Sequence, residues 1–194
     1  ALAMVERYFG DVEAREVPAY EPGELPPQTR ERSETMQDPL AERPAFHIAW
    51  HIPRSREPDH YALEMLARVL GDGASSRLYQ LLVKEEEMLQ QIYVGTDDRR
   101  GPDLFSVWAV LAEGHDGPTV RERIFAELAR IAEQGVSERE LQKAKNRVRA
   151  SFVFGLQSNR QRAHRLAEYE LYWGDATLLR REVARYEAVT REDV

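Results

Sequence analysis

The chain has 194 residues, of which 42% are hydrophobic and 31% are charged, and this length suits one well-cored globular domain with, at most, pieces of another. Its 34 acidic and 27 basic side chains give a formal net charge of -7, which disfavours a general attraction to nucleic acid or to an anionic membrane. The absence of cysteine excludes disulfides, a thiol nucleophile and a thiolate metal site, and no apolar run approaches the ~20 residues that span a bilayer.

The first part of the chain predicts a helix followed by a linker. Leu2 to Phe9 carries an amphipathic stripe, and Gly10 follows at a position where helices often end. We interpret residues 1–10 as the end of a preceding domain. Residues 11–28 hold four of the ten prolines among acidic and small residues, which favours an interdomain linker over a long surface loop within one domain.

Strand and helix patterns alternate from residue 29 onward. Residues 45–52 place a large apolar side chain at every second position, which predicts a strand. Pro58 and Gly71 bound a helical pattern, since proline suits a first helical position and glycine an end. Further elements are expected as follows: an edge strand over 29–38, a helix capped by Ser75, and a hairpin with strands over 89–96 and 104–111.

The rest of the chain is predicted to be helical. One helix should end at Gly135, and Ser137 with Glu140 forms a capping box that begins the next. Thr190 and Asp193 resemble a weaker capping box. We therefore expect one domain over residues 29–194, truncated at the start of a further helix, with an α+β fold in which helices cover a mainly antiparallel sheet.

His47 and His51, in the stretch FHIAWHIP, have the spacing of the two histidines in the inverted zinc motif H-x-x-E-H. Trp50 occupies the glutamate position and can neither activate water nor bind a metal. On a strand, the two Cα atoms would lie about 13 Å apart at ~3.3 Å per residue, too far for easy chelation. We interpret both as strand residues, predict no metal site and no catalytic residue in this chain, and expect the remaining histidines at the surface: His60, His115 and His164.

The loop GDGASS has three possible interpretations. As a phosphate cradle it is weak, because neither a Walker motif nor a third glycine follows. Its glycines can simply end one helix before the next begins, whereas a peptide-contacting loop would use the same free backbone N–H groups. The residues concerned are Gly71, Asp72, Gly73, Ala74, Ser75 and Ser76.

Basic residues are concentrated between Glu138 and Arg165, where the sequence has eight Arg or Lys residues and two acidic ones. A nucleic-acid surface has this composition, and so has a helix face that pairs with acidic neighbours. The negative charge of the whole chain favours the second interpretation.

Several sequence stretches, in this order, resemble the insulinase (pitrilysin) family of zinc metallopeptidases: VERYFGDV, the Pro-rich connector, GDGASSRLYQLLVKE, GVSERELQKAKNRVRASF and VTREDV. The resemblance covers nearly the whole chain. It is carried most specifically by Ser76–Leu82 and Glu138–Asn146, both architectural, where Arg77 and Tyr79 are expected to anchor a helix. The segment is similar to the non-catalytic domain that follows the zinc-bearing domain.

The resemblance implies that peptides are enclosed in a chamber between two halves and that zinc is bound outside this fragment, in the preceding domain of the parent protein. The family's Arg and Tyr substrate-steadying pair has no counterpart in Leu104–Glu113. By analogy with processing peptidases, Gly71–Ser76 is a substrate-binding candidate.

The expected function is that of a non-catalytic partner domain of a zinc endopeptidase that shapes the substrate chamber. The alternative is an inactive structural or assembly subunit of the same fold. Expected partners are peptide substrate, the zinc-bearing domain, and a second half of the same or another chain. A soluble bacterial compartment, cytoplasmic or periplasmic, is expected, with no nucleic-acid partner and no membrane span.

Overall fold

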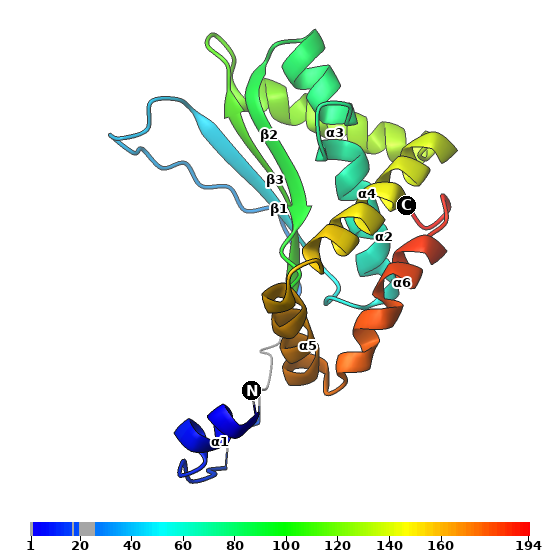
Figure 1. Cartoon of the computed structure of the whole chain (residues 1–194). Coiled ribbons are helices and arrows are strands. Elements are labelled where there is room, and N and C mark those ends of the chain that lie inside the picture. Colours follow the sequence, from blue (N-terminus) through cyan, green and yellow to red (C-terminus); the bar gives the residue numbers. More distant parts are fainter. Residues whose placement is uncertain (1, 17, 20–25) are drawn as a thin grey trace.

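The computed structural model describes residues 2–16, 18–19 and 26–194 (Figure 1). The elements follow in this order: α1 (Leu2–Phe9), β1 (Ala45–Ile52), α2 (Pro58–Gly71), the π-helix η1 (Tyr79–Glu85), β2 (Leu89–Thr96), β3 (Asp103–Leu111), α3 (Gly117–Gln134), α4 (Glu138–Gly155), α5 (Asn159–Trp173), the 3-10 helix η2 (Ala176–Arg181) and α6 (Glu182–Ala188). This arrangement confirms the predicted α+β class.

The sheet has the strand order β1-β3-β2, and both pairs are antiparallel. The register places Trp108 of β3 between His47 of β1 and Tyr93 of β2. Helices α2, α3 and α4 gather on one side of this sheet (Figure 1). The sheet therefore has one covered face and one open face.

The hydrophobic core lies between the covered face and the helices. Val107 and Ala109 of β3 are fully buried, as are Met65 of α2 and Ile124 of α3. Burial of a valine, isoleucine or methionine side chain contributes roughly 1.5–3 kcal/mol to folding, so this layer is the main source of stability. Its position explains why β1 alternates, because only every second side chain reaches the helices.

The predicted helix boundaries rest on visible caps. The hydroxyl of Ser137 accepts from the backbone N–H of Glu140, and the Glu140 side chain accepts from the backbone N–H of Ser137. Thr190 and Asp193 make the same reciprocal pair of bonds. Gly135, with φ 70°, ends α3, since a left-handed φ favours glycine.

Two predicted elements differ from the structure. Residues 29–38 form no strand, because this polar segment has one large apolar side chain, Met36, and no apolar face to bury. Ser75 does not cap a helix. The element that follows is the π-helix η1, and the Ser75 hydroxyl instead accepts a hydrogen bond from Lys143.

The proposed linker, residues 11–28, falls partly outside the described residues, namely at 17 and 20–25. Its described residues are exposed and form neither helix nor strand. Of the described helices, none is long and apolar enough to cross a membrane.

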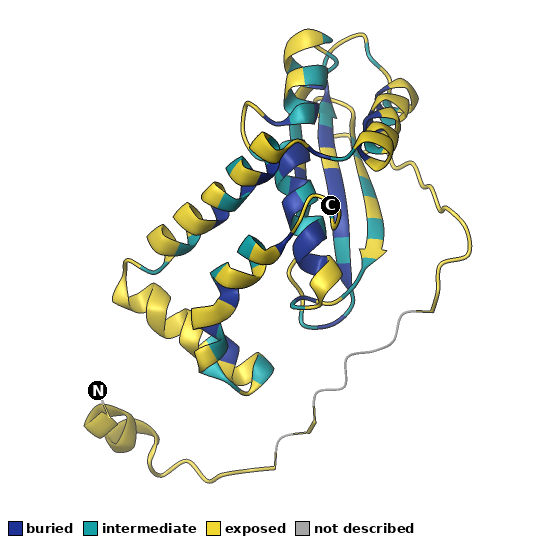
Figure 2. Cartoon of the chain, turned by 90° about the vertical axis from the view of Figure 1, so that its right-hand side faces the viewer, coloured by how far each residue is buried: buried dark blue, intermediate teal, exposed yellow. Residues whose placement is uncertain are grey.

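Burial is uneven among the helices (Figure 2). α2 has seven buried residues, whereas α5 has Tyr169 alone. The C-terminal half of α4 and most of α5 thus project from the core as an exposed helical extension (Figure 2).

Candidate functional site

Among the described residues, the strands place no charged side chain on the open face of the sheet. β1 contributes alanine and histidine residues that are all exposed, and Trp108 at 38% and Tyr93 at 58% are the most exposed aromatics beside them. In a chain with 31% charged residues, such a surface is unusual. The open face consists of Ala45, His47, Ala49, His51, Gln91, Tyr93, Gly95, Leu104, Ser106, Trp108 and Val110.

Gly95 makes room for the aromatic surface of the open face. A Cβ at this position would lie 2.4 Å from the hydroxyl oxygen of Tyr93, so the Tyr93 ring lies across the glycine. Trp108 is the direct cross-strand neighbour of Tyr93. Uncharged aromatic and small side chains of this kind can contact an extended polypeptide without selecting a particular charge.

The sequence did not single out Trp108 or Tyr93. β3 reads LFSVWAVL, an almost continuous apolar run in which the two-residue period is hidden. The exposed histidines of β1, which the sequence did place on one strand face, were the available signal for this surface.

His47 and His51 lie on the predicted strand, and both point to the open face. Trp50, between them, points to the covered face, where its ring lies 5.8 Å from those of Phe105 and Phe125. Among the described residues, no group of three or more His, Cys, Asp or Glu side chains could hold a metal ion.

The second candidate, the loop Gly71–Ser76, connects α2 to η1. Gly71 packs against β2, because a Cβ there would lie 2.6 Å from Cγ2 of Val94. Val94 faces the core, so the loop lies on the covered side of the sheet. The structure therefore keeps this loop apart from the open face.

Two cations of α4 hold the loop. Arg147 donates through Nε and Nη2 to both carboxylate oxygens of Asp72 at 2.8 Å each. Lys143 donates to the carbonyl oxygen and the hydroxyl of Ser75 at 3.2 and 2.6 Å. Within the loop, the Ser76 hydroxyl donates to the Gly73 carbonyl at 2.7 Å.

These contacts limit what the loop offers to a ligand. Gly71 and Asp72 are half-buried and Ser76 is buried, whereas Gly73, Ala74 and Ser75 are exposed. Contact with a peptide would therefore involve the three exposed residues. Gly73 has a φ of 82°, a left-handed conformation that fixes the turn and favours glycine.

The contacts of the α4 cations also bear on the two interpretations of the basic stretch between Glu138 and Arg165. Arg147 pairs with Asp72, and Arg149 pairs with Glu187 at 2.6 Å. The interpretation of a helix face with acidic neighbours is confirmed for these two residues.

Arg77 anchors the start of the η1 segment, as expected. Its guanidinium donates to Glu140 at 2.5 and 2.8 Å and to Glu127 at 3.1 Å. Glu140 is also the capping residue of α4, so one carboxylate serves two elements. The hydrogen bond from Arg77 lowers the pKa of Glu140 to about 2, aided by the backbone and hydroxyl of Ser137 and opposed by burial.

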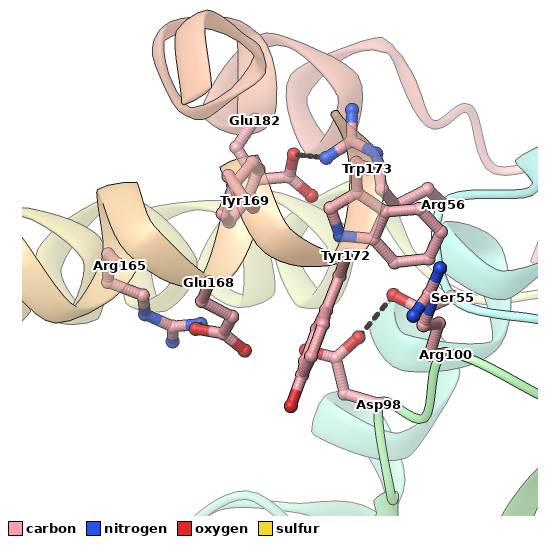
Figure 3. Close-up of a pocket in the computed structure, with 10 residues that line it drawn as sticks. All are labelled: Ser55, Arg56, Asp98, Arg100, Arg165, Glu168, Tyr169, Tyr172, Trp173 and Glu182. Carbon is pink, nitrogen blue, oxygen red and sulfur yellow. Dashed lines mark hydrogen bonds and ion pairs between the residues drawn. The ribbon is translucent and has the colours of Figure 1, made fainter. Parts of the chain in front are cut away.

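A small polar cavity of about 20 Å³ lies where the β1–α2 loop meets α5 and α6 (Figure 3). Arg56 lines it and forms an ion pair with Glu182, and its guanidinium carbon lies 5.3 and 5.8 Å from the rings of Tyr169 and Trp173. This volume holds about one water molecule. The cavity is therefore a structural joint and too small for a peptide.

His60, beside this joint, is buried and not at the surface as expected from the sequence. Its Nδ1 lies 3.3 Å from the carbonyl oxygen of Pro53, and its Nε2 lies 3.8 Å from a carboxylate oxygen of Asp98. His60 lies on the side of α2 that faces the core, although its neighbours in the sequence are polar.

A family model described as the Peptidase M16 inactive domain matches residues 1–148. The chain belongs to this family. The resemblance to insulinase-type zinc peptidases is thereby confirmed, and so is the assignment to the domain without the catalytic site.

The curated relatives of this M16 domain are bacterial. An uncharacterised zinc protease of Streptomyces coelicolor is 29% identical over 152 residues, covering 76% of this chain and 32% of the relative. One of Mycobacterium tuberculosis is 30% identical over 154 residues, covering 79% and 35%. The chain thus spans about a third of the length of these relatives.

Solved structures share the fold. A protease from Helicobacter pylori superposes with a TM-score of 0.87 at 20% identity, covering 99% of this M16 domain and 46% of that chain. The inactive peptidase domain of a zinc protease from Bordetella parapertussis gives a TM-score of 0.70 at 23% identity, covering 79% and 81%.

Proposed function

We propose that this M16 domain is the non-catalytic partner domain of a zinc-dependent endopeptidase, and that its open sheet face forms part of the wall of the substrate chamber. The observation that carries the proposal is the open face itself. It is uncharged, and it presents Trp108 and Tyr93 on a rigid sheet. The substrate would be an unfolded peptide.

The zinc would be bound by the preceding domain of the parent protein, which is consistent with relatives named zinc proteases. The metal would there supply Lewis-acid chemistry for peptide hydrolysis. This domain would contribute binding and would exclude bulk water. Residues 1–10 would end the preceding domain, 11–28 would connect the two, and 29–194 would form the partner domain.

The Gly71–Ser76 loop and the cellular compartment are the subjects of two further proposals. The exposed residues of the Gly71–Ser76 loop, which packs beside the edge strand β2, would contact a part of the peptide that extends beyond the open face. A soluble bacterial compartment, cytoplasmic or periplasmic, suits the bacterial relatives, and one structural neighbour is described as the periplasmic protease PqqL of Escherichia coli.

The parent protein provides the test. We expect stoichiometric zinc, cleavage of an unfolded peptide that a chelator abolishes, and a KM raised roughly 3- to 10-fold by a Trp108→Ala/Tyr93→Ala double variant with zinc content unchanged. The matched control is Leu40→Ala, at an 88% exposed apolar residue outside the open face. Cleavage that survives chelation would contradict the zinc mechanism.

The alternative is an inactive structural or assembly subunit. One neighbour with this fold belongs to the complex III dimer of Candida albicans, at a TM-score of 0.68 and 19% identity. A parent protein without H-x-x-E-H, without zinc and without peptide cleavage would favour this alternative.

A further inference from the structure

Ser106 points to the open face of the sheet, and yet it is buried. β3 is the middle strand, and the register places Ser106 between Ala49 of β1 and Gly95 of β2. Its exposed fraction is 6%, against 38% for Trp108 two residues further along the same strand. Small neighbours such as alanine and glycine cannot cover a serine side chain. Its burial therefore comes from the larger side chains around it.

Larger side chains of the open face surround Ser106. Side chains on one face of a strand are about 7 Å apart along the chain, so Leu104 and Trp108 stand on either side of it. The Tyr93 ring lies across Gly95, because a Cβ there would be 2.4 Å from the hydroxyl oxygen of Tyr93 and 2.8 Å from its Cζ. Ser106 thus lies at the base of a recess, which we term the Ser106 recess and define by Tyr93, Gly95, Leu104, Ser106 and Trp108.

The hydroxyl of Ser106 has no hydrogen-bond partner among the described residues. Of the described side-chain atoms, His60 Nε2 and Arg68 Nε are the ones that are both sealed from solvent and unpaired, so the Ser106 oxygen is still reached from the open face. Buried polar groups are normally paired, and a serine hydroxyl offers one donor and two acceptor positions. A ligand group that enters the recess can therefore form hydrogen bonds that the described protein does not supply.

The chemistry of the recess limits the ligand group to an uncharged, hydrogen-bonding one. Leucine, tryptophan, tyrosine, glycine and serine carry no charge at neutral pH, so a charged group would lose its hydration here without gaining a counter-ion. A purely apolar group would cover the hydroxyl and leave it unpaired, which also costs free energy. A carboxamide avoids both costs, because it is neutral and both donates and accepts.

The depth of the recess indicates that a side chain enters it. Trp108 and Leu104 are larger than Ser106, so a peptide backbone that rests on them is held away from the hydroxyl. The carboxamide of glutamine or asparagine is carried on methylene groups, which can pass between these two side chains. The backbone of the peptide can then remain on the surface of the open face.

We propose that the Ser106 recess is a specificity subsite that takes a glutamine or asparagine side chain of the substrate, and that Ser106 is the residue that binds the carboxamide. The inference rests on the proposed function, which brings an unfolded peptide to the open face. Leu104 and Trp108 would contact the methylene groups of that side chain. The rest of the open face would hold the peptide without selecting its sequence.

The test is a competition experiment with the parent protein. An uncharged peptide of about ten residues carries glutamine, methionine, glutamate or lysine at one position, which is scanned along the peptide. Each peptide competes with a fluorogenic reporter peptide for cleavage at about pH 8, where histidine is normally uncharged, and its inhibition constant Ki is measured. At one position, we expect the glutamine peptide to bind about 3- to 10-fold more tightly than the methionine peptide, and about tenfold or more tightly than the charged ones.

Ser106 variants separate recognition from simple contact. Ser106→Ala should bring the Ki values of the glutamine and methionine peptides to within about twofold of each other, because the hydroxyl is lost. Ser106→Thr keeps a hydroxyl and should keep the preference. The matched control is Ser33→Ala, which removes an exposed hydroxyl outside the sheet and should change no Ki.

Folding of each variant is checked by its denaturation midpoint. Ser106→Ala removes no hydrogen bond to a described residue, so its midpoint should equal that of the unaltered protein. If the midpoint falls, Gly95→Ala provides the second test. A Cβ at this position forces the Tyr93 ring to move, which should reshape the recess and reduce the preference for glutamine.

Two results would overturn the proposal: equal Ki values for the glutamine and methionine peptides at every position, or a glutamine preference that persists in Ser106→Ala. Weaker binding of all peptides in Trp108→Ala/Tyr93→Ala without any glutamine preference would remove the subsite but keep the proposed function. A parent protein that cleaves no peptide would contradict the proposed function. In that case, fluorescence anisotropy of the same peptides still compares glutamine with methionine directly.

Discussion

Val107 and Trp108 are consecutive residues of β3, yet they belong to two different surfaces. Val107 is fully buried against the helices, and Trp108 is 38% exposed on the open face. The covered face contributes the folding energy, while the open face is available to a ligand. Because a strand alternates sides at every residue, one β-strand serves both purposes.

The covered face should be the far more sensitive of the two. Val107→Asp would place a carboxylate in a site without a compensating partner, and we expect a loss of more than ~4 kcal/mol in the free energy of unfolding. Chemical denaturation of the chain measures it. Val107→Ile is the control for side-chain size, and a loss below about 1 kcal/mol for the Asp variant would contradict the assignment of the faces.

The covered side also depends on buried charge. Arg77→Met removes the guanidinium that joins Glu140 and Glu127, the latter with a side chain only 4% exposed. We expect a loss of about 2–3 kcal/mol, reduced because Arg130 still pairs with Glu127. A double-mutant cycle with Glu140→Gln measures the coupling, and purely additive effects would argue against the network.

The same network predicts a pH dependence. The pKa of Glu140 is lowered in the folded protein from 4.5 to about 2, mainly by the hydrogen bond from Arg77. A lowered folded pKa stabilises the protein above the unfolded pKa, and this contribution is lost as pH falls from about 4.5 towards 2. Denaturation between these pH values should show a shallower fall in Arg77→Met than in the unaltered chain, and parallel slopes would contradict the prediction.

The sequence predicted the covered face better than the open one. The caps at Ser137 and Glu140 and the strand over 45–52 follow from local rules, because hydrogen-bond reach and side-chain alternation act within a few residues. The fold class followed from their order. The candidate site could not be predicted in the same way. The open face depends on the strand register that sets Trp108 beside Tyr93, and register is a tertiary property.

Other differences have the same origin. His60 looked like a surface residue because its neighbours in sequence are polar, yet α2 turns it into the core. The order of elements suggested an edge strand over residues 29–38, but this segment has no apolar face that could pack against the core. The clamp on the Gly71–Ser76 loop comes from Arg147 and Lys143, about 70 residues away in sequence, a separation that spacing rules cannot detect.

The smallest expected effect completes the comparison. Trp108→Thr places a β-branched residue, which suits a strand, at this position and removes an aromatic ring that solvent already reaches, so we expect the free energy of unfolding to fall by no more than about 1 kcal/mol. The same variant in the parent protein should raise the KM for an unfolded peptide. A stability loss as large as that of Val107→Asp would mean that another part of the structure packs on the open face. A small loss with an unchanged KM would leave that face exposed but remove it from the substrate chamber. The proposed role therefore requires both results from this one position: near-normal stability and weakened peptide binding.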